Sequence, residues 1–273
     1  MNILFCGDSG VCRGIFYSAV SLCKHTKEDL VFYILTASIE NRKAVTPDFA
    51  QKLQKAVGEN NKVILLDISE KFCGYLPLAN MDTRFTPLCM LRLFADITPE
   101  IPEKILYLDT DVLCRADFSR LYKTDMAEFH IAGVPDRYGK WFFGNILKHN
   151  YLNSGVLLMN MEKIRKDEVF LKCREMCRDK KMFMPDQTAL NKLAKKRKIS
   201  AKYNNQGKIK EDTVFKHFTT YFKFFPYIKT VTIKPWESEK LHNELKIFEF
   251  DDILKSYERQ DNNEQRNTDI FYN

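Results

Sequence analysis

Two aspartates separated by one residue follow an apolar run in the middle of the chain. Residues 105–108 have the composition of a buried strand, and Asp109 and Asp111 come directly after them. Residues i and i+2 of an extended chain point the same way, so both carboxylates are expected to converge past the end of this strand. Oxygen ligands favour Mg²⁺ or Mn²⁺, and an ion with few protein ligands keeps positions for water or a phosphate. The pair predicts a divalent-metal site that presents a diphosphate; the alternative is an ordinary turn or helix cap.

The elements around this pair predict an α/β fold. Residues 3–5 read as a strand that ends in a turn containing Asp8, and residues 14–23 follow with the spacing of a helix. This order opens a nucleotide-binding unit, although no Gly-x-Gly-x-x-Gly is present. Asp8 stands where it can accept hydrogen bonds from a base or ribose, or it is a plain turn residue.

Further strands and helices alternate along the chain, which predicts a mostly parallel sheet with helices on both faces. Thr46 as N-cap and Pro47 at the first position begin a helix that stops at Gly58. The other strands are expected at 30–35, 63–67, 130–134 and 156–160, and the other helices at 86–97, at 161–178 and from 185 onward. The basic run 195–198 is expected at the C-terminus of the last helix, on a solvated face.

Arg92 is the one cation on the apolar helix expected at 86–97, and a charge in such a place needs a partner. It either forms a salt bridge within the fold or lies near a phosphate or the metal carboxylates. Asn153 and Gly155 stand at the entrance of the strand that ends at 160, where backbone can approach a ligand.

Size and composition fit a soluble globular protein that is one large domain or a domain with a small appendage. The chain has 273 residues, a net charge of +7 and eight scattered cysteines. The charge favours anionic partners, but no basic helix, zinc-finger spacing or ribonucleoprotein motif argues for nucleic acid. With no signal peptide and no membrane span, we expect a cytoplasmic protein whose cysteines are reduced and mostly in the core.

The order of these motifs resembles glycosyltransferase family 8, the retaining enzymes that include glycogenin and bacterial lipooligosaccharide α-galactosyltransferases. The matching pieces span nearly the whole chain and are Asp8, Arg92, Asp109-Thr110-Asp111, Tyr151-Leu152-Asn153-Ser154-Gly155-Val156, Asp186-Gln187, and His217 with Lys234-Pro235-Trp236. The resemblance implies a GT-A (Rossmann-like) fold with a small C-terminal subregion. We expect the transferase domain at 1–236 and a helical, polar extension at 237–273.

The resemblance also implies an activity, transfer of glucose or galactose from a UDP-sugar to a saccharide or glycolipid acceptor in the synthesis of lipopolysaccharide or another cell-surface polysaccharide. Mn²⁺, or Mg²⁺, would be held by Asp109, Asp111 and His217. The resemblance places Asp8 at uracil and Lys234 at the diphosphate, and Thr110 also in the substrate site. Arg92, Asn153, Asp186 and Gln187 would line the donor sugar, with Asp136 on the acceptor side.

One segment departs from the family pattern. The family has a short His-[Tyr/Phe]-x-Gly-x-x-Lys-Pro-Trp run, whereas here an aromatic insertion without that glycine separates His217 from Lys234. A basic and aromatic C-terminal third also predicts contact with an anionic membrane that carries a lipid-linked acceptor.

Retention of configuration allows two mechanisms. Asp186 is a candidate nucleophile for a double displacement, whereas Gln187 is a poor one. We favour same-face attack guided by the leaving phosphate, with Asp186 and Gln187 positioning the sugar. A UDP-sugar nucleotidyltransferase and a non-catalytic nucleotide-sugar-binding protein are the alternative functions.

Overall fold

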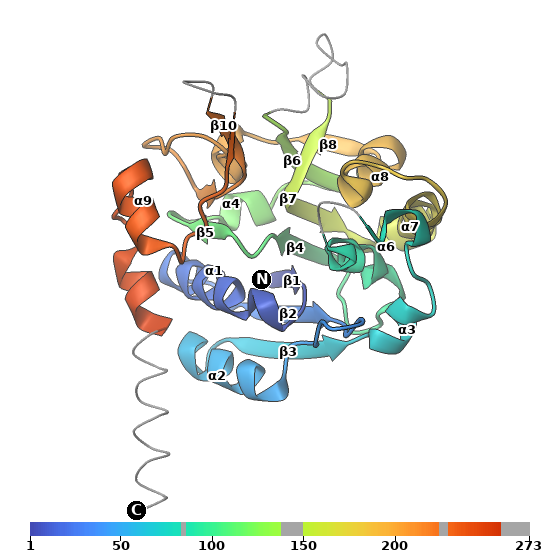
Figure 1. The fold of residues 1–273 in the computed structure, drawn as a ribbon, viewed down its shortest axis with the longest axis horizontal. Coiled ribbons are helices and arrows are strands. Elements are labelled where there is room, and N and C mark those ends of the chain that lie inside the picture. Colours follow the sequence, from blue (N-terminus) through green and yellow to red (C-terminus); the bar gives the residue numbers. More distant parts are fainter. Residues whose placement is uncertain (83–85, 138–149, 224–228, 258–273) are drawn as a thin grey trace, which may run out of the picture.

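A seven-stranded sheet forms the centre of the computed structural model, which describes residues 1–82, 86–137, 150–223 and 229–257. The strand order is β3-β2-β1-β4-β7-β6-β8 (Figure 1). The strands are β1 Asn2–Cys6, β2 Val31–Thr36, β3 Lys62–Asp67, β4 Lys104–Leu108, β6 Ile131–Pro135, β7 Leu152–Asn160 and β8 Lys196–Lys198. Within this sheet only β7 is antiparallel to its neighbours, so the prediction of a mostly parallel sheet is confirmed.

Strict alternation of side chains divides the core between the two faces of the sheet. In β1, Ile3 and Phe5 belong to one hydrophobic cluster, and Leu4 and Cys6 belong to the other. A strand buried on both faces must be apolar at successive positions, which is why these strands read as continuous apolar runs.

Helices cover both faces, as predicted (Figure 1). The helices α1 (Cys12–Lys24), α2 (Pro47–Val57) and α9 (Ser238–Leu245) bury side chains in the cluster that contains Phe5. The helices α6 (Met161–Lys166), α7 (Val169–Asp179) and α8 (Pro185–Leu193) bury theirs in the cluster that contains Leu4. Shorter helices are α3 Ser69–Cys73, α4 Ser119–Tyr122, η1 Ser9–Val11, η2 Leu78–Asn80 and η4 Ala201–Asn204.

The predicted ends of α2 are confirmed. Thr46 Oγ1 accepts a hydrogen bond from the Phe49 N–H at 3.3 Å, Pro47 is the first helical residue, and Gly58 follows the last turn with a φ of 82°. This left-handed conformation is one that glycine adopts at little cost.

The helix expected at 86–97 is present as the 3₁₀ helix η3 (Pro87–Ile97). Side chains at i and i+3 lie one above the other in such a helix. Arg92 therefore reaches back to Cys89, whose carbonyl accepts from Arg92 Nε at 3.2 Å.

Two local predictions are wrong. The helix expected at 161–178 is interrupted between α6 and α7, where Asp167 accepts a hydrogen bond from His130 Nε2 at 2.8 Å and Glu168 has a φ of 54°. The basic run does not end a helix, because α8 stops at Leu193 and β8 (Lys196–Lys198) pairs with β6 as an edge strand. Backbone pairing does not depend on side-chain type, and lysines are common on edges.

A small second sheet joins distant parts of the chain beside the main one. It pairs β5 (Val112–Cys114), which follows the two aspartates, with β9 (Phe215–His217) in antiparallel register. A hairpin of β10 (Tyr221–Lys223) and β11 (Lys229–Val231) follows, while residues 224–228 of the aromatic insertion lie outside the described residues.

The C-terminal segment packs on the same core as the N-terminal strands. Leu241 of α9 and Phe250 belong to the cluster that contains Phe5. The division at residue 236 stays a prediction. No helix among the described residues is both long and apolar enough to cross a membrane.

All eight cysteines are free thiols, as predicted, and they differ sharply in exposure. Cys73 is exposed, whereas the others are buried or half-buried. Burial raises the pKa of Cys12 to about 11 and that of Cys23 to about 12, which leaves almost no thiolate near neutrality.

We therefore expect one thiol to react rapidly with an aromatic disulfide reagent at pH 8, followed by the rest after unfolding in guanidinium. The Cys73→Ser variant should lack the rapid phase, and Cys12→Ser should keep it. A rapid phase that survives in Cys73→Ser would contradict this assignment.

Candidate active site

A pocket of about 560 Å³ opens where β1 and β4 end and β7 begins. The structure brings all eleven predicted site residues to its lining: Asp8, Arg92, Asp109, Thr110, Asp111, Asp136, Asn153, Asp186, Gln187, His217 and Lys234. The carboxyl edge of a largely parallel sheet is where ligands bind in open α/β folds.

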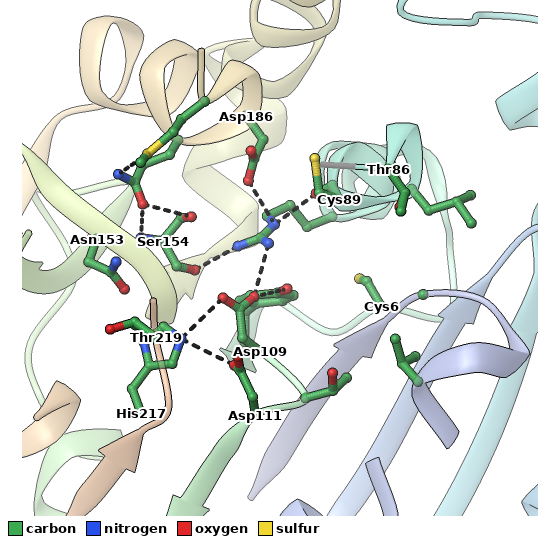
Figure 2. A pocket seen from close by; sticks show the side chains of 18 of the residues that line it. Cys6, Thr86, Cys89, Asp109, Asp111, Asn153, Ser154, Asp186, His217 and Thr219 are labelled. Carbon is green, nitrogen blue, oxygen red and sulfur yellow. Dashed lines mark hydrogen bonds and ion pairs between the residues drawn. The ribbon is translucent and has the colours of Figure 1, made fainter. Parts of the chain in front are cut away.

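Asp109, Asp111 and His217 form a cluster of metal-ligand type on one side of the pocket (Figure 2). One ligand atom from each residue lies within 4.8 Å of the other two. His217 Nε2 is 3.2 Å from Asp111 Oδ1 and 3.6 Å from Asp109 Oδ2. Two carboxylates and one imidazole suit Mn²⁺ or a similar divalent ion.

The pairing of β5 with β9 brings His217 to the aspartates across more than 100 residues of sequence. His217 stands opposite Val112 in the register, and the Phe218 N–H donates to the Asp111 carbonyl at 3.0 Å. The main-chain ladder, and not a loop, therefore sets the place of the histidine.

Glycine at position 155 is what allows this close approach. The Asp109 N–H donates to the Gly155 carbonyl at 2.8 Å, continuing the β4–β7 ladder past Leu108. A Cβ at position 155 would lie 2.1 Å from His217 Cε1 and 2.8 Å from Asp109 Oδ2. Any side chain would therefore push the histidine and the aspartate apart.

Arg92 holds the other side of Asp109 from within the core. It is only 4% exposed, and it donates from Nη2 to Asp109 Oδ1 at 3.0 Å and from Nη1 to the Ser154 carbonyl at 2.6 Å. Its Nε is 3.3 Å from Asp186 Oδ2. Burial opposes the charge of Arg92, but Tyr107, Asp186 and Asp109 raise its pKa above the ordinary value. Arg92 thus links two carboxylates of the pocket.

Lys234 compensates the charge of Asp111. Its Nζ is 2.5 Å from Asp111 Oδ2, and its side chain is 34% exposed. Burial works against ionisation of Asp111, yet His217 and Lys234 lower the pKa of Asp111 well below its usual range. Burial likewise opposes the charge of Lys234, while Asp111 raises its pKa. The pocket therefore offers a lysine cation beside the aspartates.

A chain of hydrogen bonds through the buried amides of Asn153 and Asn204 runs from Asp136 to His217. Asn153 Nδ2 donates to Asp136 Oδ2 at 2.9 Å, and Asn204 Nδ2 donates to Asn153 Oδ1 at 2.8 Å. Asn204 Oδ1 lies 3.0 Å from His217 Nδ1. We call Asp136, Asn153 and Asn204 the amide chain. Asn153, expected to line a sugar, has its amide engaged within the protein.

Asp186 and Gln187 lie in the first turn of α8 and line the pocket near Arg92. Burial and then Asp109 raise the pKa of Asp186, against the opposite effect of Arg92. Gln187 Oε1 accepts from the Ser154 N–H at 2.9 Å, and Gln187 Nε2 donates to Asp136 Oδ2 at 3.3 Å.

Asp8 lies at the end of β1 with both oxygens engaged. Oδ1 accepts from the Gly10 N–H at 2.9 Å, and Oδ2 is 3.0 Å from Arg42 Nη1.

Sequence reasoning missed Arg42 and Asn204. Arg42 lines the pocket and is paired with Asp8, and Asn204 contacts the ring of His217. Nothing in the sequence around either residue marks it, because both contacts join segments that only the fold brings together.

Comparisons with known proteins agree with this geometry. The family model "Glycosyl transferase family 8" matches residues 2–240, so the chain belongs to glycosyl transferase family 8. It is 25% identical over 187 residues to a putative glycosyltransferase of Haemophilus influenzae, covering 63% of this chain and 52% of that protein. The chain thus spans about half the length of this relative.

Two further comparisons cover most of both partners. The lipopolysaccharide 1,2-glucosyltransferase of Escherichia coli K12 is 25% identical over 266 residues, 91% of this chain and 76% of that protein. The crystal structure of the galactosyltransferase LgtC with donor and acceptor sugar analogues superposes with a TM-score of 0.64 at 19% identity, covering 94% of this chain and 96% of that one. This likeness shows a shared fold, so the expected GT-A fold is confirmed.

The Gly155→Ala variant should lose divalent-metal binding, because the new methyl group separates His217 from Asp109. We also expect the free energy of unfolding to fall by about 1–3 kcal/mol from overpacking. Mn²⁺ titration followed by electron paramagnetic resonance, with chemical denaturation alongside, measures both effects.

Gly207→Ala is the matched control, since its new Cβ would meet the end of the flexible Arg137 side chain, at 3.2 Å from Nη1, and Asn205 Oδ1 at 3.9 Å, an ordinary contact distance. If Gly155→Ala bound Mn²⁺ as the control does, the steric argument would fail.

Proposed function

We propose that this chain is a metal-dependent, retaining glycosyltransferase that moves a hexose from a UDP-sugar to a saccharide or glycolipid acceptor. The observation that carries the proposal is the cluster of Asp109, Asp111 and His217 beside Lys234 in the pocket of a family 8 chain. Carboxylates, an imidazole and a lysine cation together suit a divalent ion and the diphosphate it would present.

The chemistry of the donor set fits Mn²⁺. Asp109, Asp111 and His217 would hold the ion, and few protein ligands leave positions for phosphate oxygens. When bound, such an ion neutralises the charge that develops on the departing diphosphate.

Lys234 contributes a second positive charge to the leaving group. In the free protein its Nζ bonds Asp111, and its partial exposure leaves it able to face a diphosphate. A preorganised cation stabilises the transition state without reorganisation at the moment of reaction. Asp8, at the end of β1, would contact uracil, and Thr110, between the two aspartates, would contact the donor.

Asp186 and Gln187 are the proposed residues at the donor sugar. Arg92 fixes Asp186 through Nε, and the Ser154 N–H fixes the Gln187 carbonyl, so both side chains are held in place. Arg92 is itself buried and engaged, so we assign it to positioning Asp109 and Asp186 instead of direct contact with the sugar.

We favour same-face attack, in which the leaving phosphate guides the acceptor and Asp186 and Gln187 position the sugar. The ion pair with Arg92 and the bond to Ser154 support a positioning role for these two side chains. Double displacement with Asp186 as nucleophile is the alternative.

Glucose or galactose is the proposed sugar, and a cell-surface glycan such as lipopolysaccharide the proposed product. A lipopolysaccharide glucosyltransferase and a galactosyltransferase are both among the similar proteins, which supports a hexose without choosing between the two. Contact with an anionic membrane stays a prediction. Two aromatics expected in the membrane-facing stretch, Phe215 and Phe218, are buried and belong to the core.

UDP should bind only with the metal present, because the cluster presents the diphosphate through the ion. Calorimetric titration of UDP with and without Mn²⁺ should show binding that is lost in Asp109→Ala/Asp111→Ala. The exposed pair Glu211→Ala/Asp212→Ala changes the charge equally and should bind as the unaltered protein does. Equally tight binding without metal would remove the role assigned to the two aspartates.

Asp186→Asn keeps the shape of the side chain and removes its charge, so we expect slow turnover with an intact nucleotide site. The rate of UDP-glucose or UDP-galactose hydrolysis should fall by about 100-fold or more, while the affinity for UDP with Mn²⁺ changes little. Asp125→Asn, on the surface, should leave both unchanged. A protein that binds UDP yet hydrolyses neither sugar nucleotide would instead support the non-catalytic alternative.

A further inference from the structure

The hydrogen-bond partners of the amide chain determine which side of each amide carries the oxygen and which carries the NH₂ group. At one end the Asp136 carboxylate can only accept hydrogen bonds, so the atom of Asn153 that faces it at 2.9 Å must be the NH₂ group. Independently, the Gly155 N–H can only donate, and it lies 3.0 Å from Asn153 Oδ1. Both neighbours therefore require the same orientation of the Asn153 amide.

The orientation of the Asn153 amide determines that of Asn204, which in turn determines the position of the proton on His217. Asn153 Oδ1 accepts from Asn204 Nδ2 at 2.8 Å, so the oxygen of Asn204 must face the other way. That oxygen lies 3.0 Å from His217 Nδ1, and an amide oxygen only accepts. The proton of the neutral imidazole is then on Nδ1, and the lone pair of Nε2 faces Asp109 and Asp111.

The alternative tautomer would break the series of hydrogen bonds that joins Asp136, Asn153, Asn204 and His217. With the proton on Nε2, the ring would donate to Asp111, and Nδ1 would need a donor from Asn204. Turning the Asn204 amide would set its oxygen against the oxygen of Asn153, in a region where Asn204 is 1% and His217 is 4% exposed. Two acceptors in contact without solvent are costly. The Nδ1–H form leaves one such contact, between Nε2 and Asp111 Oδ1 at 3.2 Å, and it is the contact that a bound cation would remove.

We propose that Asn204 and Asn153 are positioning residues that fix the proton of His217 on Nδ1, so that Nε2 is free to bind the divalent cation. The identity of that cation rests on the proposed function, whereas the tautomer is a property of the chain itself. Partners that orient a ligand histidine in this way typically change metal affinity by about 10- to 100-fold when removed.

The tautomer is tested in the metal-free protein. Two-bond ¹H–¹⁵N correlation of ¹⁵N-histidine-labelled protein, at a pH where the ring is neutral, separates the two forms, and the His217 signals are those absent from His217→Gln. We expect the Nδ1–H form in the unaltered protein. A ring with the proton on Nε2 would overturn the proposal.

Two substitutions of Asn204 separate the tautomer from general packing. Asn204→Leu removes the acceptor and should give a mixture of tautomers. Asn204→Asp loses the donor to Asn153 Oδ1 but keeps an acceptor for Nδ1–H, so it tests the last link alone and should retain the form with the proton there. Asn205→Leu is the matched control, because Asn205 Nδ2 bonds Thr213 Oγ1 at 2.9 Å and the Lys208 carbonyl at 3.0 Å, away from the ring. Unchanged histidine signals in Asn204→Leu would overturn the proposal.

Mn²⁺ titration by electron paramagnetic resonance gives the second measurement. Affinity should fall by about 10- to 100-fold in Asn204→Leu and by only a few-fold in Asn204→Asp and Asn205→Leu. Equal losses in Asn204→Leu and Asn205→Leu would show a packing effect and contradict the proposal. An unaltered protein that binds no Mn²⁺ would refute the proposed metal role, and the tautomer spectrum would still decide the role of Asn204.

Discussion

The structure depends on the compensation of two carboxylates at the end of β4. Asp109 and Asp111 lie close together and partly out of water, where like charges repel strongly and uncompensated charge is costly. Two cationic side chains from distant segments lie against them, Arg92 from η3 and Lys234 after β11, and the imidazole of His217 from β9 lies beside both. The C-terminal part of the chain is therefore coupled to the N-terminal sheet by electrostatics as well as by packing.

Rigid supports surround this charged centre. Arg92 makes bonds to two carbonyls and to two carboxylates, and the amide chain joins Asp136 to the ring of His217. Among the described residues, the one buried side-chain polar atom without a hydrogen-bond partner is Oγ of Ser18, which is not among the pocket-lining residues. A fully satisfied polar network of this kind holds side chains in one arrangement, which binding and catalysis require.

The sequence predicted the sheet well because its signals are local. A strand buried on both faces must be apolar throughout, and Thr46, Pro47 and Gly58 mark helix ends through their own hydrogen bonds and φ angles. The failures have a different cause, because contacts with distant segments decide them. The segment Lys196–Lys198 contains no apolar residue, so its sequence does not predict a strand. Its pairing with β6 uses only the main chain. The break before α7 arises because Asp167 leaves the helix to meet His130, which is distant in sequence.

The sequence by itself determined which residue types the site contains and that Asp109 and Asp111 lie together, because two residues after a strand are tied by the chain itself. Only the tertiary structure decided how His217 reaches them, through the register of β5 with β9 and the absence of a side chain at Gly155. It alone decided that Asn153 points into a protein network and that Asn204 belongs to the site. A hydrogen bond between segments depends on the separation and orientation of their backbones, which the packing of the whole sheet sets.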